Sequence, residues 1–356
     1  MSLKFLNKKQ EESFESLQKY VEGLYGNRSQ KKINLYTYLT GSFVFCSFFS
    51  FMFLLWLSFN NSSIYLLAIV LLGIMSVPLL LVIGHESIHF NFSNKRRVNK
   101  IAQNVFYFLG TSPYLWKLRH LNSHHHYTNI KKWDLDIEQS KLIRLDNSQK
   151  WNKIHRFQPY YMPFLFMMYT LNWFFFRDFT DFWKYKFGNK HIESHSISKI
   201  FLLLLSKIWH LLFLLFIPII VGQSFSIAIL GFFIYHFTAS LTTALVLVST
   251  HIGEDHELLN ANNKSTMPYT WIEHQIRTSG CFSIKSRLAL HFFGGFNHHL
   301  AHHLFPNIPY VFYPHITPLI KEYCEKNNLP FVCYPNLFKC IQSHFNRLAL
   351  YSKETQ

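Results

Sequence analysis

Residues 63–90 read "SIYLLAIVLLGIMSVPLLLVIGHESIHF", an apolar run that ends in two histidines. Residues 63–84 carry no charge, and about 20 apolar residues are enough for a helix to cross a bilayer. His85 and His89 are four residues apart, so on a helix their side chains share one face. This stretch therefore predicts a membrane-spanning helix that carries two imidazoles to one membrane surface. It also matches the HExxH pattern of zinc proteases, with Glu86 as the base.

The composition of the whole chain agrees with a membrane protein. Hydrophobic residues make up 49% of the 356 residues and charged residues only 15%, which is less charge than a soluble domain carries. The formal net charge is +16, but no recognised nucleic-acid motif accompanies it, so nucleic acid is not an expected partner. Because the Lys and Arg residues flank apolar spans, anionic lipid headgroups are the expected partner. The five cysteines form no CxxC pair, so neither a zinc ribbon nor a redox dithiol is indicated.

Further apolar stretches predict an all-α integral membrane protein with about four transmembrane helices in two hairpins. The predicted spans are about 33–59, 63–84, 198–220 and 225–250, and the short connections within the two hairpins contain no Lys or Arg. By the positive-inside rule, both termini and the region between the hairpins are cytoplasmic. Residues 160–176 are at the lower length limit for a span, and a single crossing would separate the histidines. We therefore assign them to an interfacial or re-entrant position, beside a cytoplasmic histidine-rich cap.

The predicted organisation has three parts. Residues 1–32 form an N-terminal amphipathic cytoplasmic segment, in which Phe14, Leu17, Val21 and Leu24 recur at helical spacing. We expect this helix to lie on the membrane surface. Residues 33–345 form the membrane domain, and residues 346–356 form a C-terminal tail. The sequence does not distinguish a bacterial inner membrane from the endoplasmic reticulum.

Histidine is the most informative residue of this chain. The clusters are "GHESIHF" (84–90), "WKLRHLNSHHHYTN" (116–129) and "GGFNHHLAHHLFPN" (294–307). Each contains an i,i+4 pair, His85 with His89, His120 with His124 and His299 with His303, and we expect the members of each pair to point together. Many desolvated imidazoles without a partner are costly beside apolar spans, and neutral imidazole is the commonest metal ligand. The clusters therefore predict a metal centre.

The number of histidines narrows the kind of metal centre. A catalytic zinc takes about three protein ligands, whereas eight or nine histidines suit two metal ions with four or five ligands each. Imidazole shells suit iron as well as zinc. A ferritin-like site needs a Glu-x-x-His from each of two helices, and this chain supplies only Glu86 to His89.

The three clusters resemble the histidine boxes of the membrane fatty acid desaturase family, which have the forms HxxxH, HxxxHH or HxxHH, and HxxHH or QxxHH. Here they read His85-ESI-His89, His120-LNS-His124-His125 and His299-LA-His302-His303. The flanking stretches "HHHYTNIKKWDLDIE" (124–138) and "WIEHQIRTSGCF" (271–282) are also similar to the family's segments. The resemblance runs from about residue 80 to residue 340.

This resemblance implies an oxidoreductase, an O₂-dependent fatty acyl desaturase with two iron ions as cofactors and O₂ as co-substrate. The implied metal ligands are His85, His89, His120, His124, His125, His251, His299, His302 and His303. Residues expected to support these ligands are Glu86, Asn129, Asp134, Asp136 and Glu254. Residues expected to hold the polar head of the substrate are Lys117, Arg119 and Arg277. No side chain outside the metal centre is expected to act in catalysis.

Three departures from the family pattern affect the prediction. Glu86 stands where Asp is usual, and it can still orient a ligand histidine through a hydrogen bond. His299 stands where front-end desaturases have Gln, which argues against that subclass. No HPGG motif of a fused cytochrome b5 domain occurs, so the expected electron donor is a separate ferredoxin or cytochrome b5 with its reductase.

Other functions remain open at this point. A related di-iron hydroxylase or carotenoid-modifying oxygenase would share the boxes. An intramembrane zinc protease is less consistent, because site-2-type proteases use a distant Asp-Gly pair and no Asp here precedes Gly. A metal carrier would place ligands along a path inside the spans, whereas these lie at the span ends. The sequence leaves open the double-bond position, the chain length and whether the acyl group arrives on CoA, a carrier protein or a lipid.

Overall fold

The computed structural model describes residues 3–6, 10–27, 30–58, 61–137, 141–261 and 266–354, and within them the chain is mostly helical. The only strands in these ranges form two short pairs. Strand β1 (Lys186–Phe187) is antiparallel to β2 (Lys190–His191), and β3 (Cys281–Phe282) is parallel to β4 (Cys333–Tyr334). The predicted all-α class is therefore confirmed.

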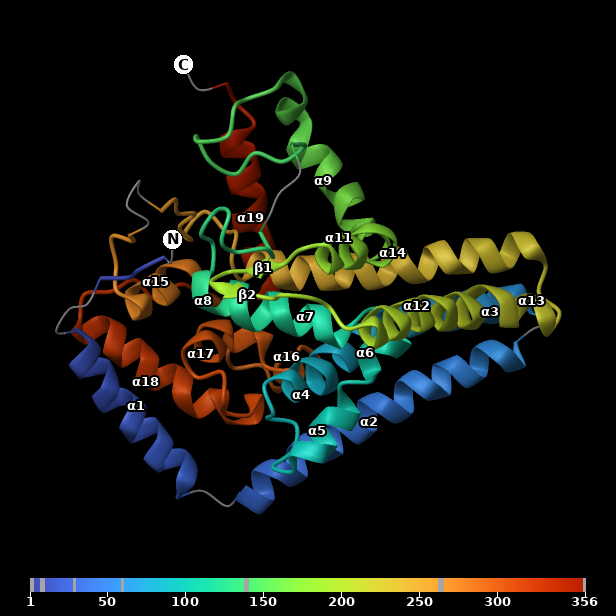
Figure 1. Cartoon of the computed structure of the whole chain (residues 1–356), viewed down its shortest axis with the longest axis horizontal. Coiled ribbons are helices and arrows are strands. Elements are labelled where there is room, and N and C mark those ends of the chain that lie inside the picture. The colour runs from blue at the N-terminus through green and yellow to red at the C-terminus, as the bar shows by residue number, and fades with distance from the viewer. Residues whose placement is uncertain are drawn as a thin grey trace.

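Four helices are long and apolar enough to cross a membrane, at Lys32–Leu57, Ser62–Ile88, Ile197–Ile220 and Phe225–Ser249. They comprise α2 (Gln30–Leu57); α3 (Ser62–Pro78) with η1 (Leu79–His85) and α4 (Glu86–Ile88); α12 (Ile197–Leu211) with η5 (Leu212–Phe216) and α13 (Ile217–Ile220); and α14 (Phe225–Ser249). Figure 1 shows them extending to one side, with both hairpin turns at the far end. The predicted two-hairpin arrangement is confirmed.

The second span changes its helical type before it reaches the histidines. Asn61 caps its start, because its side-chain oxygen accepts a hydrogen bond from the Ile64 backbone N–H at 3.1 Å. Pro78 lacks a backbone N–H, and directly after it the chain forms the π-helical turn η1. The second histidine cluster contains another π-helical turn, η2 (His120–His124). Such turns insert a residue into a helix and occur frequently at functional sites.

The remaining helices form a cap at the ends of the spans where the histidines lie (Figure 1). Between the hairpins these are α5 (Arg96–Ala102), α6 (Val105–Phe108), α7 (Pro113–Arg119) and α8 (His125–Tyr127). After the fourth span they are α15 (Trp271–Thr278), α16 (Arg287–Phe292), η6 (Phe296–His298), α17 (His299–Leu304), η7 (Tyr310–Phe312), α18 (Tyr313–Lys326) and α19 (Leu337–Tyr351).

The predicted N-terminal helix forms as α1 (Gln10–Gly26). Its apolar residues face the protein: Phe14 and Val21 are buried, and the Phe14 ring packs against Phe305 and Tyr323. Residues of the cap thus cover the apolar side of this helix, and its position on the membrane surface stays a prediction. Residues 1–2, 7–9 and 28–29 of the predicted segment, and 355–356 of the predicted tail, lie outside the described residues. Helix α19 continues through Tyr351, across the predicted start of the tail.

The aromatic stretch 160–176 does not form one straight helix. It is covered by α9 (Gln158–Met167), α10 (Tyr169–Asn172) and η4 (Trp173–Arg177), with a turn at Met168. The short helix η3 (Lys153–Phe157) precedes these elements and α11 (Asp178–Phe182) follows them. Helices α9 and α10 pack against α14. The side chains of Phe157, Tyr160 and Phe164 are exposed, which is consistent with the predicted interfacial position.

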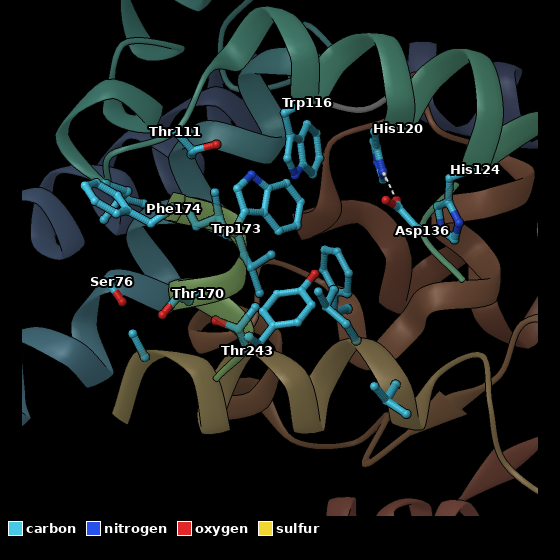
Figure 2. A pocket seen from close by; sticks show the side chains of 18 of the residues that line it. Ser76, Thr111, Trp116, His120, His124, Asp136, Thr170, Trp173, Phe174 and Thr243 are labelled. Atoms are coloured by element: carbon cyan, nitrogen blue, oxygen red, sulfur yellow. Dashed lines mark ion pairs between the residues drawn. The ribbon is translucent and has the colours of Figure 1, made fainter. Parts of the chain in front are cut away.

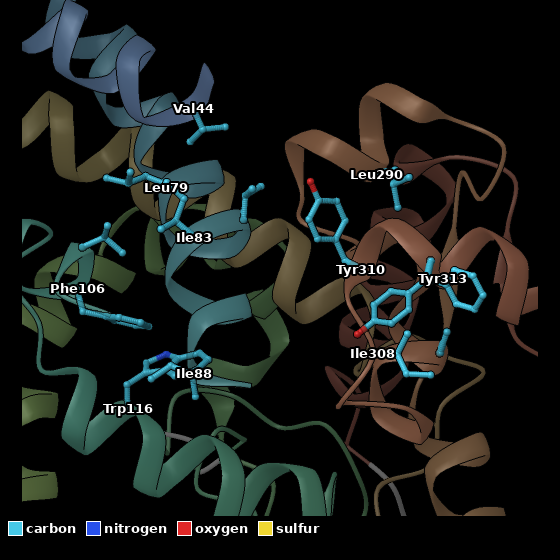
Figure 3. Close-up of a cluster of buried hydrophobic side chains, with 14 of the residues drawn as sticks. Val44, Leu79, Ile83, Ile88, Phe106, Trp116, Leu290, Ile308, Tyr310 and Tyr313 are labelled. Carbon is cyan, nitrogen blue, oxygen red and sulfur yellow. The ribbon is translucent and has the colours of Figure 1, made fainter. Parts of the chain in front are cut away.

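Spans and cap share one buried core. Leu79 and Ile83 of the second span belong to the same cluster of buried side chains as Tyr310 and Tyr313 of the cap, and Figure 3 shows both parts. Because this core is continuous, the cap is held in one position relative to the span ends.

Gly73 lies at a close contact between α3 and α14. A Cβ atom at Gly73 would lie 2.9 Å from the Tyr235 carbonyl oxygen and 3.0 Å from the Thr238 Cβ. Small residues at such contacts let membrane helices approach closely. We therefore expect Gly73→Ala to lower the free energy of unfolding by about 1–3 kcal/mol, measured by thermal unfolding in detergent. Gly23→Ala on α1, where nothing lies within 4 Å of the new Cβ, is the matched control and should be neutral or stabilising. Equal stabilities for the two variants would contradict this packing.

Candidate metal centre

The nine box-associated histidines come together in two buried groups. The first contains His85, His89, His120, His125 and His302, and the second contains His124, His251, His299 and His303; within each group the possible ligand atoms lie within 4.8 Å of one another. All nine side chains are at most 7% exposed. The structure thus brings together every histidine that the sequence nominated as a ligand.

The spacing within the first group fits a metal ion. The Nε2 atom of His120 lies 3.1 Å from that of His85, 3.1 Å from that of His89 and 2.9 Å from that of His125. The Nε2 atoms of His302 and His125 are 3.0 Å apart. Imidazole nitrogens bind metals at about 2.0–2.1 Å, so two ligands at right angles are about 3.0 Å apart.

The second group has its lone pairs directed inward. His251 Nε2 lies 2.7 Å and His303 Nε2 lies 3.2 Å from His299 Nε2. The Nδ1 atoms of His124, His251 and His303 face oxygen acceptors, namely the Asp134 carboxylate, the Thr278 carbonyl and the Gln275 side-chain oxygen. Since these Nδ1 atoms must donate hydrogen bonds, each Nε2 carries the lone pair that a metal needs. The donor set of both groups therefore fits a metal site.

The π-helical turn explains how the second cluster is divided between the groups. On an α-helix, His120 and His124 would share a face, and the sequence analysis expected them to point together. Across η2 the backbone hydrogen bond spans five residues, from the His125 N–H to the His120 carbonyl oxygen, and His120 shares its group with His125. His124 belongs to the second group, although its ring still stacks on that of His120, with centroids 5.5 Å apart, and both histidines lie near the Asp136 carboxylate. The pairs His85 with His89 and His299 with His303 remain within one group each.

Burial keeps the histidines neutral. Desolvation lowers the pKa of His89 to about 3, and the nearby charge of Lys117 contributes. Burial, followed by mutual repulsion among the rings, places the pKa values of His120, His125, His251, His299, His302 and His303 well below their usual range. His124 is the exception: burial opposes its charge, but the Asp134 carboxylate raises its pKa. Neutral rings are the form that binds metal.

Two of the expected supporting residues contact the ligand histidines directly. Asp134 accepts a hydrogen bond from His124 Nδ1 at 3.0 Å and one from the Asn129 backbone N–H at 2.9 Å. Asn129 has a left-handed backbone (φ 58°), and its side-chain amide donates to the carbonyl oxygen of His251 at 2.7 Å. Together these hydrogen bonds connect the second histidine cluster to His251, which follows the fourth span.

The other three expected supporting residues are arranged differently. Glu86 is fully buried and accepts a hydrogen bond from the Tyr310 backbone N–H at 3.1 Å, so it connects the second span to the cap. Asp136 lies 3.9 Å from His120 Nδ1 (Figure 2) and forms an ion pair with Arg119. Glu254 contacts α19, through Asn346 and Ser343.

The three basic residues expected at the substrate head group differ in their pairing. Arg119 is fully buried, forms ion pairs with Asp136 and Asp181, and lies over the Trp173 ring. Arg277 pairs with Glu257 and Glu273. Lys117 is half-buried over the Phe90 ring, 4.9 Å from its centroid. The charges of both arginines are therefore balanced by the protein's own carboxylates.

Histidines beside the boxes lie outside both groups. The exposed His126 bonds to the Leu121 carbonyl oxygen, and the buried His298 bonds to Thr317. His195 of the polar loop bonds to Tyr114 and to the Lys184 carbonyl oxygen. His191 is exposed on β2.

Sequence reasoning missed several partners of the ligands. Gln275 and Thr278 belong to the segment 271–282 that supported the resemblance, so this motif could have identified them as partners of the histidines. Tyr313, whose hydroxyl lies 3.0 Å from His302 Nδ1, had no such signal.

An apolar cavity of about 160 Å³ opens from the metal centre (Figure 2). His120, His124, His251 and His299 line one end of it. From there it follows one face of α14 past Thr243 and Ala239 to His236, beneath the Trp116 and Trp173 rings. The fold and site thus define a helical membrane protein with a histidine-rich metal site above an apolar cavity.

Comparison with known proteins identifies this class. Residues 60–335 match the family model described as Fatty acid desaturase. The chain is 28% identical over 272 residues to the sn-1 linoleoyl-lipid 6-desaturase of Synechocystis sp., covering 76% of each chain. It is 29% identical over 266 residues to the protein of the same name from Arthrospira platensis, covering 75% of this chain and 72% of that one. It is also 27% identical to the acyl-lipid (8-3)-desaturase B of Dictyostelium discoideum, covering 74% of this chain and 59% of that one.

The chain therefore belongs to the fatty acid desaturase family, as the histidine boxes predicted. It is an oxidoreductase of the membrane, and its substrates are fatty acyl chains or lipids.

Substitution of one histidine in each group tests whether the two groups bind metal ions independently of each other. We expect the full-length protein to bind two metal ions per chain, and His302→Ala and His299→Ala each to bind one, because each variant disrupts one group only. Metal content is measured by elemental mass spectrometry after purification in detergent. His126→Ala, which changes an exposed histidine, is the control and should retain both ions. A single ion in the wild-type protein would contradict the two-group arrangement.

The role of Asp134 is testable without removing a ligand. Asp134→Asn keeps the size of the side chain but weakens its hold on His124. We expect the affinity of one metal ion to fall by about 10–100-fold and the affinity of the other to stay unchanged, measured by competition with a chelator. Glu254→Gln, which alters a residue that contacts α19, should leave both affinities unchanged.

Proposed function

We propose that this protein is an O₂-dependent acyl-lipid desaturase with a di-iron centre. The observation that carries the proposal is the position of the two histidine groups at the end of an apolar cavity between α3 and α14. The nine histidines named above would hold the two ions, five on one and four on the other. Bound iron would supply the reduction of O₂ and the oxidation of unactivated C–H bonds.

The protein's own contribution is binding, orientation and exclusion of water. Trp116, Trp173 and Leu247 give the cavity apolar walls, which suit an extended hydrocarbon chain. Held there, two adjacent CH₂ groups of the chain lie against the histidine end, and the fixed position selects which carbons react. In the overall reaction, two hydrogens leave these carbons, and one O₂ with two external electrons and two protons becomes two waters.

The electrons in this proposal come from a ferredoxin or a cytochrome b5 with its reductase. We place the metal centre and the described ends of the chain in the cytoplasm, because basic residues flank the histidine end of the spans. Lys95, Arg96, Arg97 and Lys100 follow the second span directly and are exposed. This side gives soluble electron carriers access to the cap.

The names of the relatives refine the substrate. Two of them act on linoleoyl lipids at position 6, and another is an acyl-lipid desaturase. They support a lipid-bound acyl chain over acyl-CoA. They also oppose our interpretation of His299 as evidence against a front-end desaturase. A double bond inserted at position 6 of a linoleoyl chain lies on the carboxyl side of the double bonds already present, which is where a front-end desaturase acts.

The alternatives have less support. A hydroxylase would use the same centre, and only its product would distinguish it. For a zinc protease, Glu86 would have to face a metal-bound water, whereas one of its oxygens accepts from the Tyr310 backbone and the other lies 3.9 Å from His85 Nδ1, the ring nitrogen opposite the one that faces the histidine group. A metal carrier would need ligands along the spans, and both histidine groups lie at one end of them.

Expression in a host with a simple lipid profile tests the proposal. With iron, O₂ and a competent reductase, we expect a new unsaturated acyl chain in the lipid fraction, detected by mass spectrometry. His303→Ala should reduce it to below about one hundredth of the wild-type amount, because even partners of ligands contribute 10–100-fold. His126→Ala should match the wild type. A hydroxylated chain in its place, or an unchanged lipid profile, would refute desaturation.

A further inference from the structure

The end of the cavity farthest from the metal centre is polar, although it lies among the membrane-spanning helices. His236 of α14, Ser76 of α3 and Thr170 of α10 line it. Figure 2 shows Ser76 and Thr170 at the opposite end of the pocket from His124. From Ser249 at the end of α14 to His236 is about 20 Å at 1.5 Å per residue. Ionisable groups inside a membrane are costly and mark functional positions.

The hydrogen bonds of His236 determine its tautomer. The Thr170 hydroxyl donates to the carbonyl oxygen of His236 at 3.1 Å, and the same hydroxyl oxygen lies 3.0 Å from His236 Nδ1. The Thr170 hydroxyl oxygen also lies 2.6 Å from the Ser240 hydroxyl oxygen. All three contacts are hydrogen bonds only where Thr170 donates to the carbonyl oxygen and accepts from both Ser240 and His236 Nδ1, and this arrangement places the proton of the His236 ring on Nδ1. His236 Nε2 is then a bare acceptor, and no atom of the described residues donates to it, although the side chain is only 2% exposed.

A second histidine beside it has the same property. His210 Nδ1 lies 3.1 Å from the Phe108 carbonyl oxygen, so it donates and leaves its Nε2 as an acceptor. That Nε2 also has no donor among the described residues. The two rings are neighbours, with centroids 5.3 Å apart. One end of the cavity therefore presents an acceptor, with a second directly behind it.

The nearby charges are already balanced. Lys207 donates to the Asp178 carboxylate at 2.6 Å and to the Gly110 carbonyl oxygen at 2.7 Å. The other oxygen of Asp178 accepts from Thr111 at 3.1 Å and from the Trp173 indole at 2.9 Å. A further ion would be uncompensated here, so the matching ligand is neutral and donates a hydrogen bond.

We propose that this end of the cavity is a binding subsite for an O–H group, which donates to His236 Nε2. Water and a hydroxyl group on a bound chain share this chemistry. A methyl end at the same place would leave the acceptor unpaired, at a cost in free energy. The subsite thus favours a chain with a hydroxyl at this depth and disfavours an apolar end there. The inference depends on the cavity and its hydrogen bonds, and it does not require the proposed desaturation.

The test has two measurements on the iron-loaded full-length protein, both without turnover. The first is a crystal structure without added lipid, in which we expect ordered water about 3 Å from His236 Nε2. The second is binding of fatty acids of graded length that end in a hydroxyl, compared with methyl-ended acids of the same lengths, followed by tryptophan fluorescence. At the length that reaches His236, we expect at least about fivefold tighter binding of the hydroxyl form.

Two variants test whether His236 Nε2 is the atom that binds the water or the hydroxyl group. His236→Phe keeps a ring but removes the acceptor, so it should abolish both the water and the preference. Thr242→Val changes a hydroxyl on α14 that bonds to the Thr238 carbonyl oxygen and does not line the cavity, and it should retain both. Ordered water at His236 Nε2, without tighter binding of the hydroxyl-ended acid at any chain length, would support the subsite with water as its ligand. A preference without water would support it with the chain hydroxyl as its ligand. Neither signal, or a preference that persists in His236→Phe, would overturn the proposal.

Discussion

The structure depends on the convergence of nine imidazoles in a space that excludes water. Their Nε2 atoms lie as close as 2.7–3.2 Å, a spacing suited to a shared metal ion and unfavourable without one. Segments distant in sequence must therefore be held rigidly. The Glu86–Tyr310 hydrogen bond fixes the second span to the cap, and the Asn129–His251 hydrogen bond fixes the second cluster to the fourth span. Desolvation, which lowers the pKa of His89 to about 3, keeps the ligands in their metal-binding form.

Much of this could be predicted from the sequence, because its strongest signals are local. Charge-free apolar runs predicted the spans, and the histidine motifs predicted which histidines come together. The division of the second cluster could not be predicted, since the spacing rule assumes an α-helix and η2 is a π-helical turn. The position of Arg119 was also not accessible: its isolated charge suggested a substrate contact, while the fold places Asp136 and Asp181 beside it. Long-range pairing of this kind leaves no periodic pattern in the sequence.

The cavity connects the metal centre to the membrane part of the fold. Along α14, His236, Ala239, Thr243 and Leu247 recur every three or four residues and line it, so a helical face sets its course from the histidines into the spans. Its middle is apolar and its far end is polar. The distance that a bound chain extends along α14 therefore determines whether its end contacts apolar or polar side chains. In the proposed function and subsite, reaction and selection would take place at opposite ends of this cavity.

The central claim is that two metal ions share nine histidines, with His120 and His124 on different ions. It is tested most directly by anomalous diffraction at the iron absorption edge from crystals of the full-length iron-loaded protein. We expect two peaks, one bonded to His85, His89, His120, His125 and His302 and the other to His124, His251, His299 and His303, at about 2.1 Å from the bound nitrogens. A single peak, or His120 and His124 on the same ion, would contradict it.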